Sequence, residues 1–193
     1  RSILGTLGRP LAAPAKAPGG RFHGWQGLRR QRLPGLGGRW IARCDAPDLD
    51  LFGARYPGLR DVRVYAALEV GAFHLGLWGL SWLARAGLLR PDRLAAPLIG
   101  LKRRLAFLGS DRGGMVVTLA GRDAANRPQR LTWHLVAASG HGPYIPATPS
   151  VLLAKRLLAG TLATRGTMPC VGLFTLAEFL AEVTDLDIVA GTA

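Results

Sequence analysis

The segment from Gly140 to Ile145, G-H-G-P-Y-I, combines residue types that can serve a bound ligand. Glycine lets the backbone approach another molecule closely. Histidine and tyrosine carry polar groups that can hold a substrate or move a proton. Gly140 and Gly142 are therefore candidate substrate-binding residues, and His141 and Tyr144 are candidate catalytic residues. A turn with a purely structural role is the alternative interpretation.

The same segment does not match a dinucleotide-binding fingerprint. The pattern G-x-G-x-x-G places a third glycine where this sequence has Ile145. Pro143 and Pro146 also lack the backbone N–H groups that a pyrophosphate would need. The preceding strand is expected to belong to a hairpin rather than to a parallel crossover. The sequence thus predicts a ligand-facing loop here, but not a nucleotide cradle.

A second polar loop, S-D-R-G-G at 110–114, stands just before a predicted hairpin. The guanidinium of Arg112 can bind a carboxylate through two parallel hydrogen bonds. Asp111 can face a ligand or simply form a turn, and the sequence leaves both readings open. Asp111, Arg112 and Gly113 are the second set of candidate substrate-binding residues.

The sequence gives little support for a metal site or for a catalytic nucleophile. The sequence contains no P-loop, no H-E-x-x-H, no C-x-x-C, no G-x-S-x-G and no kinase motif. Its four histidines and two cysteines are not spaced as metal ligands, and two cysteines are too few for a disulfide scaffold. A Ser139–His141 nucleophile pair lacks a third group that would orient the imidazole. We expect no metal site.

Charge points first to an anionic partner. The 193 residues include 25 basic and 12 acidic side chains, for a net charge of +13. Only Lys16, Lys102 and Lys155 are lysines, so arginine dominates, and no recognition-helix, zinc-finger or RNP pattern accompanies the charge. A hydrophobic content of 49% excludes a fully disordered chain. The sequence argues against nucleic acid as a partner.

The elements that must position these loops form an α+β pattern. Residues 1–38 are rich in glycine, proline and arginine, and we expect a basic arm or linker there. Residues 39–193 are expected to form one domain with a mixed, largely antiparallel sheet and helices packed on one face. Strands are predicted at 39–44, 61–66, 114–121, 129–138 and 186–189, and helices at 151–159 and 175–183. The last helix opens with the capping box T-L-A-E.

Residues 67–89 are the most apolar part of the chain, with fifteen uncharged residues between Glu69 and Arg85. This run is shorter than a membrane span, and we expect a buried helix that ends near Gly87. Trp78 and Trp82 keep a membrane interface open as an alternative. A basic amphipathic helix is predicted next, at 91–107, and it carries the cluster Lys102–Arg104.

Four segments, R-W-I-A-R-C-D-A-P-D-L-D-L-F-G-A-R-Y-P-G (39–58), S-D-R-G-G-M-V-V (110–117), G-P-Y-I-P (142–146) and P-C-V-G-L-F-T-L-A-E-F-L (169–180), carry a resemblance. Together they resemble the C-terminal portion of bacterial saccharopine dehydrogenase-like NAD(P)-binding oxidoreductases, over nearly all of the chain. Full-length members begin with a Rossmann domain and its glycine fingerprint, which this sequence lacks.

The resemblance implies a substrate-binding and dimerisation domain that faces the nicotinamide end of the cofactor. NAD(P) would be bound mainly by the absent Rossmann domain, so no cofactor is expected on this chain alone, and the isolated chain would be incomplete for catalysis. The expected partners are a small-molecule substrate and a second copy of the chain in a homodimer. The expected location is the cytoplasm, with membrane association through residues 67–89 left open.

A different class of function also fits the residues. The apolar segment 67–89 and the basic arm suit a non-enzymatic module for a membrane surface or for protein interaction. Binding to anionic vesicles distinguishes this alternative from the oxidoreductase. The sequence alone does not choose between them.

Overall fold

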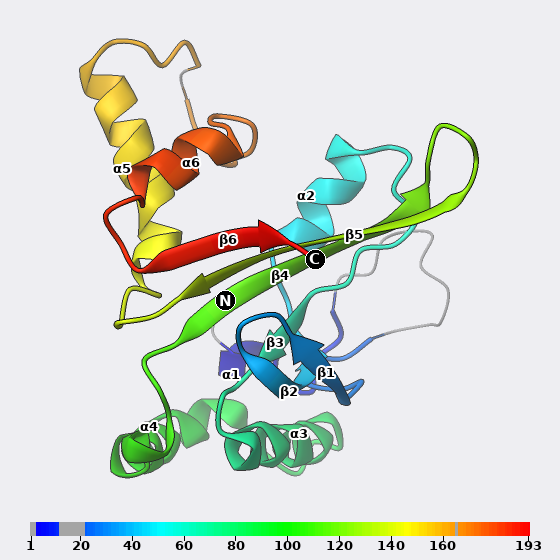
Figure 1. Ribbon diagram of the computed structural model, residues 1–193. Helices are drawn as coiled ribbons and strands as arrows, with labels where there is room; N and C mark the ends of the chain where they lie inside the picture. The colour runs from blue at the N-terminus through cyan, green and yellow to red at the C-terminus, as the bar shows by residue number, and fades with distance from the viewer. Residues whose placement is uncertain (1–2, 12–21, 165) are drawn as a thin grey trace. The chain divides into compact units, whose positions relative to one another are not determined.

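The computed structural model describes residues 3–11, 22–164 and 166–193 (Figure 1). The chain separates into two compact units, and each is described by itself. The first contains residues 1–33 and 37–110, and the second contains residues 34–36 and 111–193. Both units combine helices with a small antiparallel sheet, which confirms the α+β class. In place of the single mixed sheet that the sequence predicted, the described residues form two antiparallel sheets of three strands each.

The sheet of the first unit has the order β1-β2-β3, with strands at Arg29–Leu33, Gly37–Arg43 and Tyr65–Ala67. Its core cluster consists of Leu7, Trp25 and Ala42, against which Leu77 and Leu80 pack. The fully buried Trp25 explains why this cluster forms, since one indole removes a large apolar area from water.

Burial in this core corrects the expectation of an arm at 1–38. Leu7 is 1% exposed and Trp25 is 0% exposed, and α1 (Ile3–Thr6) precedes the first of them. Backbone hydrogen bonds join Trp25 to Arg43 and Gly8 to Gly24. Residues 3–11 and 22–33 are therefore built into the first unit, because their apolar side chains pack together across the glycine-rich turns.

Helices complete the first unit. They are α2 (Asp48–Arg55), α3 (Gly71–Arg85), the 3-10 helix η1 (Pro91–Leu94), α4 (Ala95–Arg104) and the 3-10 helix η2 (Ala106–Leu108). Helix α3 ends just before Gly87, whose φ of +74° suits glycine, as the sequence predicted. It is not a fully buried helix, however, because only His74 and Ser81 of its residues are buried. No helix among the described residues is long and apolar enough to cross a bilayer.

The second unit has the sheet order β4-β5-β6, with strands at Gly113–Arg122, Pro128–Ala137 and Ile188–Thr192. The predicted hairpin is confirmed, and its turn lies at residues 123–127. Helices α5 (Tyr144–Leu158) and α6 (Leu176–Glu182) lie on one side of this sheet (Figure 1). Leu135, Phe179 and Val183 form the buried core between them.

The two helices of the second unit differ in how well the sequence predicted them. The capping box at Thr175 is present, and α6 starts one residue later. Helix α5 starts at Tyr144, seven residues before the predicted start at 151. Pro146 stands in the first turn, where a backbone N–H has no partner within the helix, and Pro149 is accepted inside the helix. The prolines were therefore a poor guide to the helix start.

Candidate functional site

The register of one hairpin places the two predicted loops at the same end of a sheet. Gly113 pairs with Ala137 where β4 begins and β5 ends. Asp111 and Arg112 thus enter the sheet at the end where residues 138–142 leave it. Strand β6 begins at the same end, because Ile188 also pairs with Ala137. Segments that lie far apart in the sequence therefore share one end of one sheet.

A tight turn shapes the second of these loops. The backbone N–H of His141 donates to the carbonyl of Ala138 at 2.9 Å. The two central residues, Ser139 and Gly140, have φ values of 54° and 71°. Positive φ at both central positions is the conformation of a type I′ turn, which glycine adopts without strain. The conformation of this turn therefore explains the glycine at position 140 without a bound ligand.

Asp187 holds this turn from the neighbouring strand. The hydroxyl of Ser139 donates to Oδ2 of Asp187 at 2.8 Å. The backbone N–H of Asp187 donates to Nδ1 of His141, also at 2.8 Å. Sequence reasoning missed Asp187, because its position beside the loop depends on the pairing of β5 with β6. Only its place at the start of a predicted strand pointed to it.

These two hydrogen bonds decide what the histidine and the serine can do. The Ser139 hydroxyl gives its hydrogen to a carboxylate rather than to the imidazole, so the pair is not arranged as nucleophile and base. Because Nδ1 of His141 accepts a hydrogen bond, the neutral ring carries its proton on Nε2. His141 is thus prepared to donate a hydrogen bond to a ligand.

Tyr144 lies beside this histidine at the start of α5. The two ring centroids are 5.7 Å apart and the rings are nearly perpendicular. The Tyr144 side chain is 54% exposed, so its ring is open to solvent. The structure therefore brings both candidate catalytic residues together on a surface.

The remaining candidates are exposed or lack a special conformation. Asp111 and Arg112 are both exposed. A Cβ added at Gly113, Gly140 or Gly142 would meet nothing within 4 Å. The backbone there does not enclose a cavity, and the arrangement is an open surface at one end of the sheet. Arginine can bind a carboxylate through two hydrogen bonds, and the Nε2–H of His141 can donate to an oxygen acceptor.

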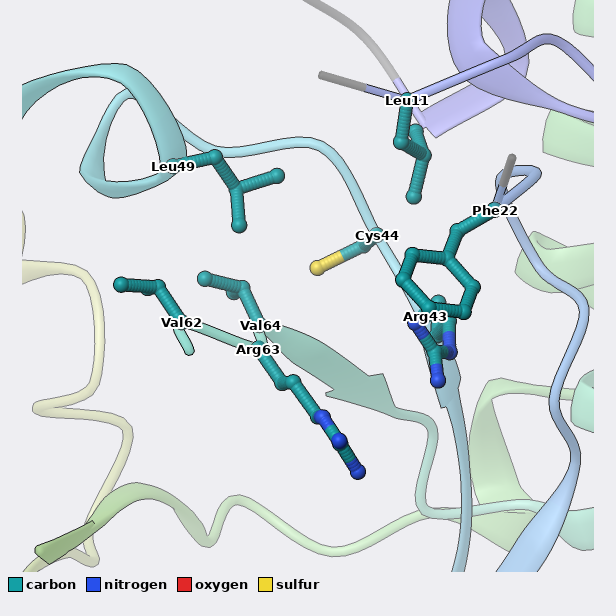
Figure 2. A pocket seen from close by; sticks show the side chains of 8 residues that line it. All are labelled: Leu11, Phe22, Arg43, Cys44, Leu49, Val62, Arg63 and Val64. Atoms are coloured by element: carbon teal, nitrogen blue, oxygen red, sulfur yellow. The ribbon is translucent and has the colours of Figure 1, made fainter. Parts of the chain in front are cut away.

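The pocket in Figure 2 lies in the first unit and was not predicted from the sequence. It encloses about 10 Å³ around Cys44, whose sulfur points between the side chains of Leu49 and Val64. Arg43 and Phe22 also line this pocket, and the Arg43 guanidinium lies 3.3 Å from the ring centroid of Phe22. Burial, helped by the nearby Asp45 and Asp48, raises the pKa of the Cys44 thiol to about 11. A thiol in this state is a packing group and not a nucleophile.

A larger hollow also lies in the first unit, where α3 is followed by η1. It has a volume of about 370 Å³ and its polar lining includes Arg9, Arg90 and Asp92. Leu7 and Leu89 contribute apolar walls. Among the residues that the structure describes, no three histidine, cysteine or carboxylate side chains gather as metal ligands.

Comparison with models of known protein families gives no match for this chain. Comparison with curated protein sequences gives no significant match either.

Proposed function

We propose that the second unit is the substrate-facing part of an NAD(P)-dependent oxidoreductase similar to the saccharopine dehydrogenase-like family. In this proposal a separate Rossmann domain holds the nucleotide, and the chain taken alone does not transfer hydride. The supporting observation is the register of β4 and β5, which brings Arg112 and His141 to the same end of one sheet. The four segments that carry the resemblance include both of these loops in whole or in part.

Arg112, His141 and Tyr144 each have a distinct part in the proposal. The guanidinium of Arg112 binds the carboxylate of a small organic acid. His141 donates its Nε2–H to a second oxygen of that substrate, and Asp187 keeps the ring in the orientation that permits this. The Tyr144 hydroxyl lies on the same surface and supplies a further hydrogen bond. The substrate class is a small carboxylic acid with a second oxygen acceptor.

The division of labour is tested by adding NADPH to the chain and following the nucleotide fluorescence. A longer protein that carries a Rossmann domain before Arg1 is titrated in parallel. We expect saturable NADPH binding only by the longer protein. Light scattering of the longer protein should give the mass of a dimer. Tight NADPH binding by the 193-residue chain would overturn the division of labour.

The site is tested separately, by turnover in the longer protein and by thermal shift of the 193-residue chain with a panel of small carboxylic acids. Arg112→Ala and Tyr144→Phe should each lower turnover, and Arg112→Ala should also abolish the carboxylate-dependent shift. Arg130→Ala is the matched control, because Arg130 is an exposed arginine of β5 that pairs with Ala120, seven residues into β4. If Arg112→Ala behaves like this control, the site assignment is wrong.

A further inference from the structure

Helix α3 exposes a face whose own residues carry no charge, and the guanidinium of Arg85 lies 5.5 Å from the Trp82 ring centroid beside it. His74 and Ser81 mark its buried side and lie seven residues apart. On the opposite side, the helical period brings Ala72, Leu75, Gly76, Gly79, Trp82 and Leu83 together. Leu75, Trp82 and Leu83 are 39%, 48% and 44% exposed. The water-facing side of a helix in a globular protein usually carries charged and polar residues, so this face lacks its usual composition.

The segment that follows adds more exposed apolar side chains. None of the ten residues of α4 is buried. Ile99 and Leu101 of this helix are 53% and 44% exposed, and Phe107 and Leu108 beyond it are 77% and 52% exposed. We call residues 71–109, from the start of α3 to the residue after η2, the apolar-basic surface. Exposed apolar side chains thus recur along both helices of this segment, and clusters of such side chains on a protein surface mark interaction sites.

The charges of the apolar-basic surface select the partner. Between residues 71 and 109 there are six basic side chains and one acidic side chain, Asp92, for a net charge of +5. The last turn of α4 holds Lys102, Arg103 and Arg104, all of them exposed. If a second copy of the chain docked through the same surface, two surfaces of net charge +5 would face and repel each other. An anionic lipid surface is complementary to both features, because its headgroups attract the basic side chains and its acyl chains accept the exposed tryptophan and leucine side chains.

The hollow at the end of α3 provides a place for an anionic headgroup. Arg9, Arg90 and Asp92 line it, so its charged side chains sum to +1, and Leu7, Leu89 and Pro91 give it apolar walls. Arginine is well suited to bind phosphate through two parallel hydrogen bonds. Leu88, next to this lining, is 76% exposed and extends the apolar contact. Charge and apolar surface therefore occur together here, as they do in a phospholipid.

We propose that the apolar-basic surface docks the chain on an anionic phospholipid bilayer. Trp82, Leu83 and Phe107 enter the interface between headgroups and acyl chains. Lys102, Arg103 and Arg104 contact the lipid phosphates, and the hollow between Arg9 and Arg90 receives one headgroup. This inference is independent of the oxidoreductase proposal, since it concerns the first unit and no step of a reaction.

Co-sedimentation of the 193-residue chain with vesicles tests the proposal. One set of vesicles contains only phosphatidylcholine, and the other contains a quarter phosphatidylglycerol. We expect binding to the anionic vesicles that is weakened but not abolished in 0.5 M salt. The triple variant Lys102→Gln/Arg103→Gln/Arg104→Gln should lose affinity on the order of 100-fold, at roughly a factor of five for each basic residue near an anionic surface.

Matched variants separate the surface from overall composition. Arg30→Gln/Arg32→Gln/Arg130→Gln removes three exposed charges from strands outside the surface and should bind nearly as the wild type does. Trp82→Gln/Leu83→Gln should lose the salt-resistant part of binding. Leu157→Gln/Leu158→Gln changes two exposed leucines of α5 and should retain it. Circular dichroism of every variant confirms that it is folded.

Trp82 also gives a direct readout of insertion. Lipids brominated on the acyl chain should quench tryptophan fluorescence in the wild type, and most of this quenching should disappear in Trp82→Phe. Three outcomes would overturn the proposal: no binding to anionic vesicles, equal loss in the two triple variants, or a wild-type dimer that Trp82→Gln/Leu83→Gln converts to a monomer. The last result would assign the surface to a second copy of the chain.

Discussion

The imidazole of His74 lies against the indole of Trp25, with 5.0 Å between the ring centroids, and both side chains are 0% exposed. Nδ1 of His74 accepts a hydrogen bond from the backbone N–H of Leu68 at 3.3 Å. Its Nε2 is buried and has no hydrogen-bond partner in the described part of the chain. Desolvation by this burial lowers the pKa of His74 below its ordinary value of 6.5. The histidine is thus held neutral inside the core of the first unit.

The stability of the first unit should fall in mild acid because of His74. Its pKa is lower in the folded state than in the unfolded state, so the unfolded chain binds more protons below pH 6.5. The contribution of a neutral His74 is present above pH 6.5 and is lost as the pH falls through and below that value. Urea unfolding at pH 7.5, 6.5 and 5.5, followed by tryptophan fluorescence, measures this loss.

His74→Asn provides the comparison for this pH dependence. The asparagine amide oxygen can accept the same backbone N–H, and it does not titrate. The variant should be less stable than the wild type at pH 7.5 but should lose less stability on acidification. His23→Gln serves as the control and should retain the wild-type pH dependence. An unchanged pH dependence in His74→Asn would contradict the role given to His74.

The two cysteines should differ sharply in reactivity. The Cys44 pKa of about 11 is two units above its ordinary value of 9.0, so its thiolate at pH 8 is about 100-fold scarcer. Cys170 is exposed. With Ellman's reagent at pH 8, one thiol should react quickly and the second only slowly, and both should react in denaturant. Cys170→Ser should remove the fast phase, and a fast phase that persists would show Cys44 to be reactive.

The capping box at Thr175 should contribute measurably to the second unit. The Thr175 hydroxyl accepts from the backbone N–H of Glu178 at 3.2 Å, and the Glu178 carboxylate accepts from the backbone N–H of Thr175 at 2.7 Å. Thr175→Ala leaves the backbone N–H of Glu178 without its acceptor and should lower the free energy of unfolding by about 1 kcal/mol. Urea unfolding measures this, and Thr175→Ser should restore most of the loss. Equal stability of the alanine and serine variants would contradict the cap.

The core of the second unit should be most sensitive at Leu135. This side chain is 0% exposed and packs with Phe179 and Val183. Leu135→Ala removes buried methyl groups and leaves a cavity, which should cost about 2–5 kcal/mol of unfolding free energy. Leu131 lies four residues earlier in the same strand and is 48% exposed, so Leu131→Ala should cost about 1 kcal/mol or less. Similar losses in the two variants would mean that Leu135 is not central to the core.

Local chemistry in the sequence predicted part of this fold. The β-branched and aromatic residues on either side of residues 123–127 predicted the β4–β5 hairpin, and T-L-A-E predicted the start of α6. Both depend on interactions between residues close in the chain. The burial of Leu7 and Trp25 depends on contacts between distant residues, and the glycine and proline content there suggested an arm instead.

The candidate site was predictable only in its parts. The polar loops at 110–114 and 140–145 were visible in the sequence, and the hairpin register places them at the same end of the sheet. Asp187 was not visible, since its contacts with Ser139 and His141 require β6 to pair with β5. The direction of the hydrogen bond at Nδ1, which excludes a base at that atom, likewise appears only when Asp187 is in place.

The backbone amide of Asp187 leaves an approaching molecule only the protonated edge of the His141 ring. A compound that offers a carbonyl, carboxylate or phosphate oxygen gains a bond at that edge, whereas an ammonium group gains none. Discrimination between these two chemical classes therefore depends on which ring nitrogen of His141 carries the hydrogen. The backbone N–H of residue 187 determines this, and any amino acid except proline would supply that N–H.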